Sequence, residues 1–195
     1  MLITKLEKID QKRVKIYIDY EYSFLLYNTD LRRYRIEEDS EISEATYQEI
    51  IEETVYRRAK QKALAILKYM DRTEYELRDK LKQAYYSDEI IQRVIEYVRS
   101  YHYIDDDRYT LNYITYKKGY KSKRQIQVEL YRKGIDKSLM AKYLESEMEN
   151  DDSAIQKAIM KKTKDSSMLT KEEKQKLIAS LCRKGFAYED VVRYL

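Results

Sequence analysis

The sequence predicts a mainly α-helical protein: three tandem three-helix modules preceded by a small antiparallel β meander. The 195-residue chain contains no proline that would break a helix, and it is rich in residues that favour helices. A set of apolar positions recurs about every 50 residues, whereas a period-of-two apolar pattern is confined to the first 35 residues. Because tandem modules stack on their neighbours, we expect an elongated, curved helical repeat.

Residues 1–53 are expected to form a β-rich, acidic extension. The segment RVKIYIDYEYSFLLY alternates apolar side chains from Val14 to Phe24, and ITKLEK supplies a strand before it. Turns are expected near 9–12 and 19–21, although neither contains glycine. A helix is expected from about Glu44. The extension holds 8 Lys and Arg against 13 Asp and Glu, so we expect a small separate unit whose removal leaves the helices folded.

Helical modules are expected over residues 54–103, 104–150 and 151–195. Leu81, Leu130 and Leu181 lie 49 and 51 residues apart, and each has apolar residues four before and five, ten and fourteen after it. The first helices of the modules are expected at about 54–70, 106–118 and 152–164. Each second helix is expected to begin with a capping box, formed by Thr73 and Glu76, Ser122 and Gln125, and Thr170 and Glu173.

Two of the three glycines occupy the same place in successive modules. Gly134 and Gly185 each follow Arg-Lys at the end of a second helix and precede a large apolar residue, Ile135 or Phe186. A residue just beyond a helix end commonly takes the left-handed conformation, which glycine adopts without a Cβ clash. We therefore expect both to have positive φ. The first module has Tyr85 at this place, which predicts a strained or different turn.

A basic stripe in the second module is the candidate binding feature. Between residues 117 and 133 there are seven bases and one acid, Glu129. Such a stripe can neutralise phosphates or an acidic protein surface, or it can simply be a solvated helix face. The candidate partner-binding residues are Lys117, Lys118, Lys121, Lys123, Arg124, Arg132 and Lys133, together with Arg183 and Lys184 in the third module.

Catalytic chemistry has little support in the sequence. There is one histidine, His102, and one cysteine, Cys182, which excludes a histidine-rich metal site and an internal disulfide. Asp105–Asp107 are successive and do not converge on one ion, and no glycine-rich phosphate loop is present. We expect no enzyme, metal or cofactor. A hydrolase that uses Asp105–Asp107 is the catalytic alternative, which metal-dependent turnover would reveal.

No apolar run exceeds five residues, and the first ten residues contain no apolar leader pattern. We therefore expect a cytoplasmic protein that does not enter the membrane.

The stretch SYHYIDDDRYTLNYITYKKGYKSKRQIQVELYRKGI resembles the RecX regulatory proteins of bacteria. TEYELRDKL before it and LCRKGFAYEDVVRYL after it also match the family in order and spacing, so that the resemblance covers about residues 54–195. Tyr20, Tyr85 and Thr110 depart from the family's pattern.

The resemblance implies a three-module helical protein that binds the RecA recombinase. It implies binding in the groove of the RecA–DNA filament, where family members limit filament growth, strand exchange and ATPase activity, and it implies no catalytic residues. The alternative is a stand-alone DNA-binding protein that contacts phosphates through the basic stripe. A steep salt dependence of DNA affinity without RecA would favour that alternative. Weak direct DNA contact is compatible with both, and a monomer is expected.

Overall fold

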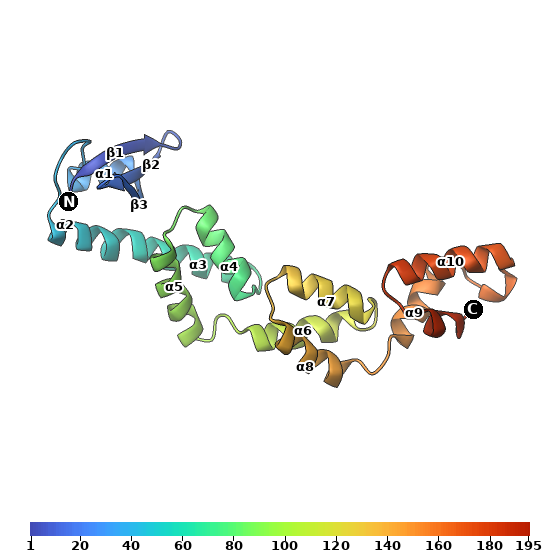
Figure 1. Ribbon diagram of the computed structural model, residues 1–195. Helices are drawn as coiled ribbons and strands as arrows, with labels where there is room; N and C mark the ends of the chain where they lie inside the picture. Colours follow the sequence, from blue (N-terminus) through green and yellow to red (C-terminus); the bar gives the residue numbers. More distant parts are fainter. The chain divides into compact units, whose positions relative to one another are not determined.

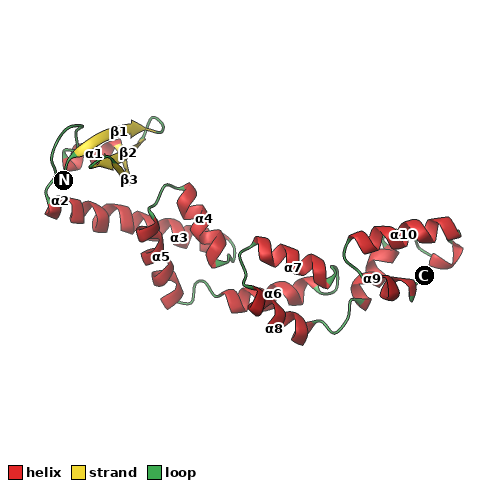
Figure 2. Ribbon diagram, in the orientation of Figure 1, coloured by secondary structure: helices red, strands yellow, loops and turns green.

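The computed structural model describes residues 1–195, and it divides into two compact units, Met1–Ile104 and Asp105–Leu195. The chain is mainly helical, with one small sheet at its N-terminal end (Figures 1 and 2). The expected fold class, helices preceded by a β meander, is therefore confirmed.

The first unit begins with a three-stranded antiparallel sheet in the order β1-β2-β3. Its strands are β1 (Ile3–Lys8), β2 (Arg13–Ile18) and β3 (Glu21–Tyr27). Asp19 and Tyr20, between β2 and β3, have φ of +49° and +70°. A two-residue hairpin loop with both φ positive matches the right-handed twist of the strands, so the tight turn forms here without glycine.

One face of the sheet packs on helices. Val14, Ile16 and Ile18 alternate as buried residues along β2, which is the expected period of a half-buried strand. The sheet is followed by α1 (Asn28–Tyr34) and then by α2 (Glu44–Glu49), the π-helical segment η1 (Ile50–Tyr56) and α3 (Arg57–Tyr69). The last three are contiguous and form one helical run (Figure 1).

The sheet and this helical run share one hydrophobic core. The rings of Phe24 and Tyr47 lie 5.9 Å apart, and the Tyr34 and Thr54 hydroxyls are hydrogen-bonded at 2.9 Å. Buried side chains from Ile3 to Ile104 belong to the same cluster. The expectation that residues 1–53 form a separate unit is therefore at odds with the packing, since position 53 falls within η1, whose Ile51 and Val55 belong to this core. The further division at residues 104 and 151 stays a prediction of the sequence.

Deletion of residues 1–50 is now expected to unfold the first unit and leave the second folded. The truncation would expose Ile51, Val55 and Ala59, which are buried in the intact chain, and buried apolar surface is the main stabilising contribution in a domain of this size. Hydrogen exchange should show rapid exchange in α3 and slow exchange beyond residue 105. Protected amides throughout α3 in the truncated chain would show instead that the strands are dispensable.

The first unit ends with α4 (Glu74–Gln83) and α5 (Asp88–Ser100). Between them Tyr85 has φ of +66°, the conformation that glycine has in the other modules. The sheet holds this turn, because the Tyr22 hydroxyl donates to the Tyr85 carbonyl and Lys15 Nζ lies 4.9 Å from the centre of the Tyr85 ring. These contacts offset the strain of a side chain in the left-handed region.

The second unit contains two three-helix arrangements with separate cores. The first has α6 (Asp106–Lys117), α7 (Lys123–Arg132) and α8 (Lys137–Glu147), and the second has α9 (Asp152–Met160), α10 (Lys171–Arg183) and α11 (Tyr188–Val192), with a short 3₁₀ turn η2 (Ser166–Met168). The expected helix over 152–164 therefore ends four residues early. One core centres on Ile126, Leu130 and Leu144, the other on Leu177, Leu181 and Val191.

Caps define where the second helices begin. Thr73, Ser122 and Thr170 all form the reciprocal capping boxes that the sequence predicts. At the other ends of these helices, Gly134 and Gly185 have φ of +79° and +90°, as expected from their position beyond a helix end.

Candidate partner-binding surface

The N-terminus of α7 is joined to the end of α10 by hydrogen bonds that the sequence does not reveal. Ser122 is fully buried, and its Oγ accepts from the Gln125 N–H at 3.2 Å and donates to the Lys184 carbonyl at 2.6 Å. The Lys123 N–H donates to the Asp151 carboxylate at 3.0 Å. The two three-helix arrangements of the second unit are therefore joined at a polar contact.

Gly185 lies in this contact. A Cβ built on it would lie 2.8 Å from Arg124 Cβ and 3.0 Å from Ser122 Oγ, which is closer than carbon atoms pack in proteins. Glycine at this position therefore meets two requirements: it adopts the positive φ of the turn, and its lack of a Cβ leaves room for α7 to approach closely. The contact brings Arg124 of the second module beside the Lys184–Gly185 turn of the third, although these residues are 60 positions apart.

The half-buried Asp151 is an unusual member of this contact. Burial raises the pKa of its carboxyl, and the nearby Asp190 and Asp152 raise it further, against the lowering effect of the Lys123 N–H. A carboxylate at the start of α7 is also favoured by the helix dipole.

Four of the nine candidate cations are exposed and form no ion pair. They are Arg124, Arg132, Arg183 and Lys184. Arg124 and Arg132 lie eight residues apart on α7, so they project from the same face of that helix. We call these four residues the exposed cation set. They are the part of the stripe that remains available to a partner.

The other cations of the stripe are engaged within the second unit. Lys118 Nζ lies 2.9 Å from the Glu147 carboxylate, and Lys121 pairs with Glu129. The Lys123 side chain is partly buried, and its backbone N–H donates to Asp151. The sequence could not distinguish these residues from the exposed set, because pairing with acids 8 and 29 positions away depends on how the helices and their connecting loop pack.

Lys117 and Lys133 lie over a pair of tyrosines. The rings of Tyr109 and Tyr113 stack 6.0 Å apart. Lys117 Nζ is 5.8 Å from the Tyr113 centroid and Lys133 Nζ is 5.4 Å from the Tyr109 centroid. Cation–π contacts of this kind contribute modestly at exposed sites, and here they hold two lysines close to the protein surface.

Glu129, the only acid in the stripe, is held ionised by this cluster. Burial alone would raise the pKa of its carboxyl, but hydrogen bonds from Lys121 and Tyr113 outweigh burial and lower that pKa. The Tyr113 hydroxyl donates to Glu129 at 2.6 Å. Glu129 therefore compensates part of the positive charge on one side of α7.

The residues considered for catalysis have structural partners. Asp105 accepts from the Arg108 N–H at 2.9 Å as the N-cap of α6, and Asp107 accepts from Lys142 at 3.2 Å and from Tyr143 at 3.1 Å. His102 has φ of +54° at the end of α5, and Cys182 is a half-buried residue of α10. No group of three or more His, Cys, Asp or Glu side chains is placed to hold a metal ion. No helix has both the length and the apolar character needed to cross a membrane.

Known proteins are similar to this chain both in single modules and over nearly its whole length. A model of the first three-helix domain of RecX matches residues 59–97, and a model of its third three-helix domain matches residues 149–195. Regulatory protein RecX of Clostridium acetobutylicum is 33% identical over 198 residues, which cover 97% of this chain and 92% of that protein. The chain belongs to the RecX family. The resemblance predicted from the sequence is thereby confirmed.

Other RecX proteins agree with this assignment. Regulatory protein RecX of Clostridioides difficile is 30% identical over 202 residues and covers all of this chain and 94% of that protein. A crystal structure of regulatory protein RecX covers 97% of this chain and 96% of its own, with 25% identity and a TM-score of 0.64. That of RecX from Lactobacillus salivarius covers 71% of this chain and 92% of its own, with 24% identity and a TM-score of 0.59, and shows the shared fold alone. RecX proteins are named as regulators and not as enzymes.

Proposed function

We propose that this chain is a cytoplasmic inhibitor of the RecA recombinase that binds the RecA–DNA filament and limits its growth, strand exchange and ATPase activity. Family membership supports the regulatory role, and the exposed cation set is the observation that supports a binding surface. A nucleoprotein filament presents phosphates and acidic side chains in a regular array, so several cations of one monomer can meet several opposite charges at once.

The exposed cation set is expected to carry the charge-dependent part of this binding. Changing all four residues to glutamine (Arg124→Gln, Arg132→Gln, Arg183→Gln and Lys184→Gln) removes the charge but keeps most of each aliphatic stem. Because rim charges contribute roughly 0.2–1 kcal/mol each, we expect about tenfold weaker binding to RecA filaments on single-stranded DNA and a shallower salt dependence. Filament affinity and inhibition of strand exchange at several salt concentrations are the measurements.

A matched control changes four exposed lysines elsewhere to glutamine, namely Lys8, Lys12, Lys62 and Lys68. Both variants lower the formal net charge from +4 to zero, so a difference between them reports position and not total charge. Equal inhibition by the parent and the exposed-set variant at physiological salt would show that the stripe is a solvated face. Salt-dependent binding to single-stranded DNA alone, with no binding of RecA, would favour the stand-alone DNA-binding alternative.

A further inference from the structure

An apolar groove lies between α7 and α8 of the second module, with a volume of about 490 Å³. Gln127, Val128 and Tyr131 line it from α7, and Lys137, Met140 and Ala141 line it from α8. Val128 is 43% exposed and Tyr131 is 64% exposed. Large apolar side chains left open in a groove are typical of a surface that another molecule covers.

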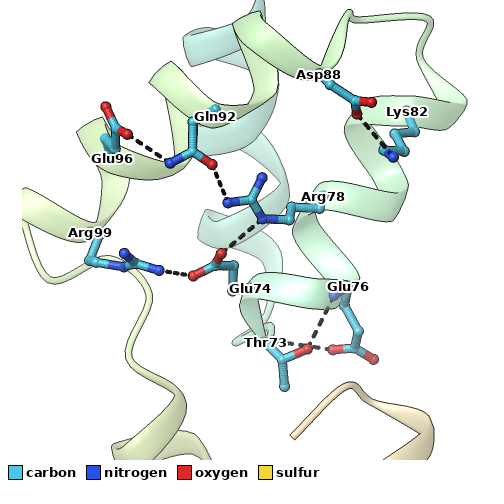
Figure 3. Close-up of polar contacts among 9 residues, drawn as sticks. All are labelled: Thr73, Glu74, Glu76, Arg78, Lys82, Asp88, Gln92, Glu96 and Arg99. Carbon is cyan, nitrogen blue, oxygen red and sulfur yellow. Dashed lines mark hydrogen bonds and ion pairs between the residues drawn. The ribbon is translucent and has the colours of Figure 1, made fainter. Parts of the chain in front are cut away.

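The first module has the same two helices but bridges them with polar side chains. The Arg78 guanidinium donates to Gln92 Oε1 at 2.6 Å, and Lys82 Nζ lies 2.9 Å from the Asp88 carboxylate. Figure 3 shows these two links between α4 and α5, with Glu74, Glu96 and Arg99 extending the same network.

The repeat places different residues at these positions in the second module. Counting 49 residues on from each member, Arg78 and Gln92 become Gln127 and Ala141, and Lys82 and Asp88 become Tyr131 and Lys137. Alanine has no polar group, and a tyrosine and a lysine do not form an ion pair at neutral pH. The bridges of the first module are absent, and the groove stays open.

The charges around the groove indicate the chemistry of its occupant. Two of its lining residues, Arg132 and Lys137, are cationic, and none is acidic. Asp136, the adjacent acid, caps α8 and accepts from the Ser138 N–H at 2.8 Å and from its hydroxyl at 2.5 Å. A segment that carries an apolar side chain flanked by carboxylates complements this arrangement in both shape and charge.

We propose that the α7–α8 groove receives an apolar side chain from an acidic protein segment, whose carboxylates contact Arg132 and Lys137. The inference rests on the proposed function, because it assigns this segment to the RecA filament. The groove adds an apolar anchor to the contacts of the exposed cation set, and fully desolvated apolar anchors contribute more to affinity than rim charges.

The first module supplies a design for closing the groove. The variant Gln127→Arg, Tyr131→Lys, Lys137→Asp and Ala141→Gln transfers both bridges of the first module to the second. All four positions are exposed, and the changes leave the net charge unaltered. We expect binding to RecA filaments, assembled on single-stranded DNA with a non-hydrolysable ATP analogue, to weaken at least tenfold. Part of the loss should persist at high salt, since the graft removes an apolar contact as well as the charge of Lys137, and only the charge contribution is screened by salt.

Two further variants accompany the graft. Val128→Ser removes an apolar wall without changing any charge and is expected to weaken binding severalfold. If the graft does not fold, the filament affinity of Val128→Ser tests the groove proposal by itself. Tyr69→Lys is the control, because Tyr69 is 87% exposed and lies in the first unit. It is expected to bind like the parent.

The outcomes separate the two proposals. If the parent chain does not bind RecA filaments, the proposed function fails, and this occupant fails with it. If the parent binds and both groove variants bind equally well, the groove proposal alone is overturned. A parent that sediments as a dimer and a graft that sediments as a monomer would assign the groove to a second copy of the chain, which also contradicts the proposal.

Discussion

Replacing Asp30 by asparagine is expected to lower the free energy of unfolding of the first compact unit by about 3 kcal/mol. Asp30 is 5% exposed, and its carboxylate accepts two hydrogen bonds from the Arg58 guanidinium, at 2.5 and 2.9 Å. It also accepts from the Tyr27 N–H at 2.8 Å. Removing one partner of a buried ion pair costs about 3–5 kcal/mol, because it leaves the other charge uncompensated. Because the Arg58 side chain is one-third exposed, we expect a loss of stability at the lower end of this range.

The same pair predicts a pH dependence. Burial alone would raise the pKa of Asp30, but the hydrogen bonds from Arg58 and the Tyr27 N–H outweigh burial and lower that pKa. The unfolded chain therefore binds a proton more readily at this group than the folded chain. The stabilisation is present above the unfolded pKa of about 4 and is lost as the pH falls through the lower folded pKa.

Hydrogen exchange of α3 peptides in urea, at pH 7 and pH 3, measures this unit separately from the other. The free energy of unfolding of the first unit should differ strongly between the parent and Asp30→Asn at pH 7, and this difference should be smaller at pH 3. Glu52→Gln is the control, because Glu52 pairs with Arg93 at 2.8 Å but is 46% exposed, and exposed pairs contribute about 1 kcal/mol or less. Equal losses for the two variants would contradict the role given to Asp30.

Replacing Gly185 by alanine is expected to destabilise the second unit by about 3 kcal/mol. A Cβ at φ of +90° costs about 1–2 kcal/mol. The same Cβ would lie 2.8 Å from Arg124 Cβ, and overpacking of this kind costs about 1–3 kcal/mol. Because Arg124 Cβ is attached to the backbone of α7, the clash cannot be relieved by a side-chain rotation.

Gly119→Ala is the matched control for this prediction. A Cβ at Gly119 would meet the Lys157 amine at 3.1 Å, and the end of a lysine side chain moves easily. We expect a loss of less than about 1 kcal/mol, since surface substitutions rarely cost more. Urea unfolding followed by exchange of α7 and α10 amides measures both variants. Similar stabilities for Gly119→Ala and Gly185→Ala would show that α7 does not approach the Gly185 turn closely.

Much of the local structure could be predicted from the sequence, because it depends on short-range periodicity and on capping. The alternation from Val14 to Phe24 predicted a strand, and the Ser122–Gln125 pair predicted where α7 begins. The spacing of Leu81, Leu130 and Leu181 predicted the repeated modules. These features depend on residues within a few positions of one another, or on a repeat that recurs along the chain.

The candidate site was only partly predictable. The nine cations were identified as a group, but Lys118 and Lys121 are neutralised by Glu147 and Glu129, whereas Arg124 and Lys184 remain exposed. The α7–α8 groove was missed. The sequence repeat does contain the relevant difference, because Arg78 and Gln92 of the first module correspond to Gln127 and Ala141 of the second. That difference predicts an open groove only when the two helices are known to face each other.

The sequence by itself determined the helical class, the β meander, the capping boxes and the membership of the RecX family, because each follows from local pattern or from similarity along the chain. Only the tertiary structure decided that the strands share a core with α3 and that the Tyr22 hydroxyl is hydrogen-bonded to the Tyr85 turn. It alone also showed that α7 packs closely against Gly185. The physical reason is that these contacts join residues about 25 to more than 60 positions apart. Their stabilisation depends on packing, burial and charge pairing between elements whose approach no local pattern specifies.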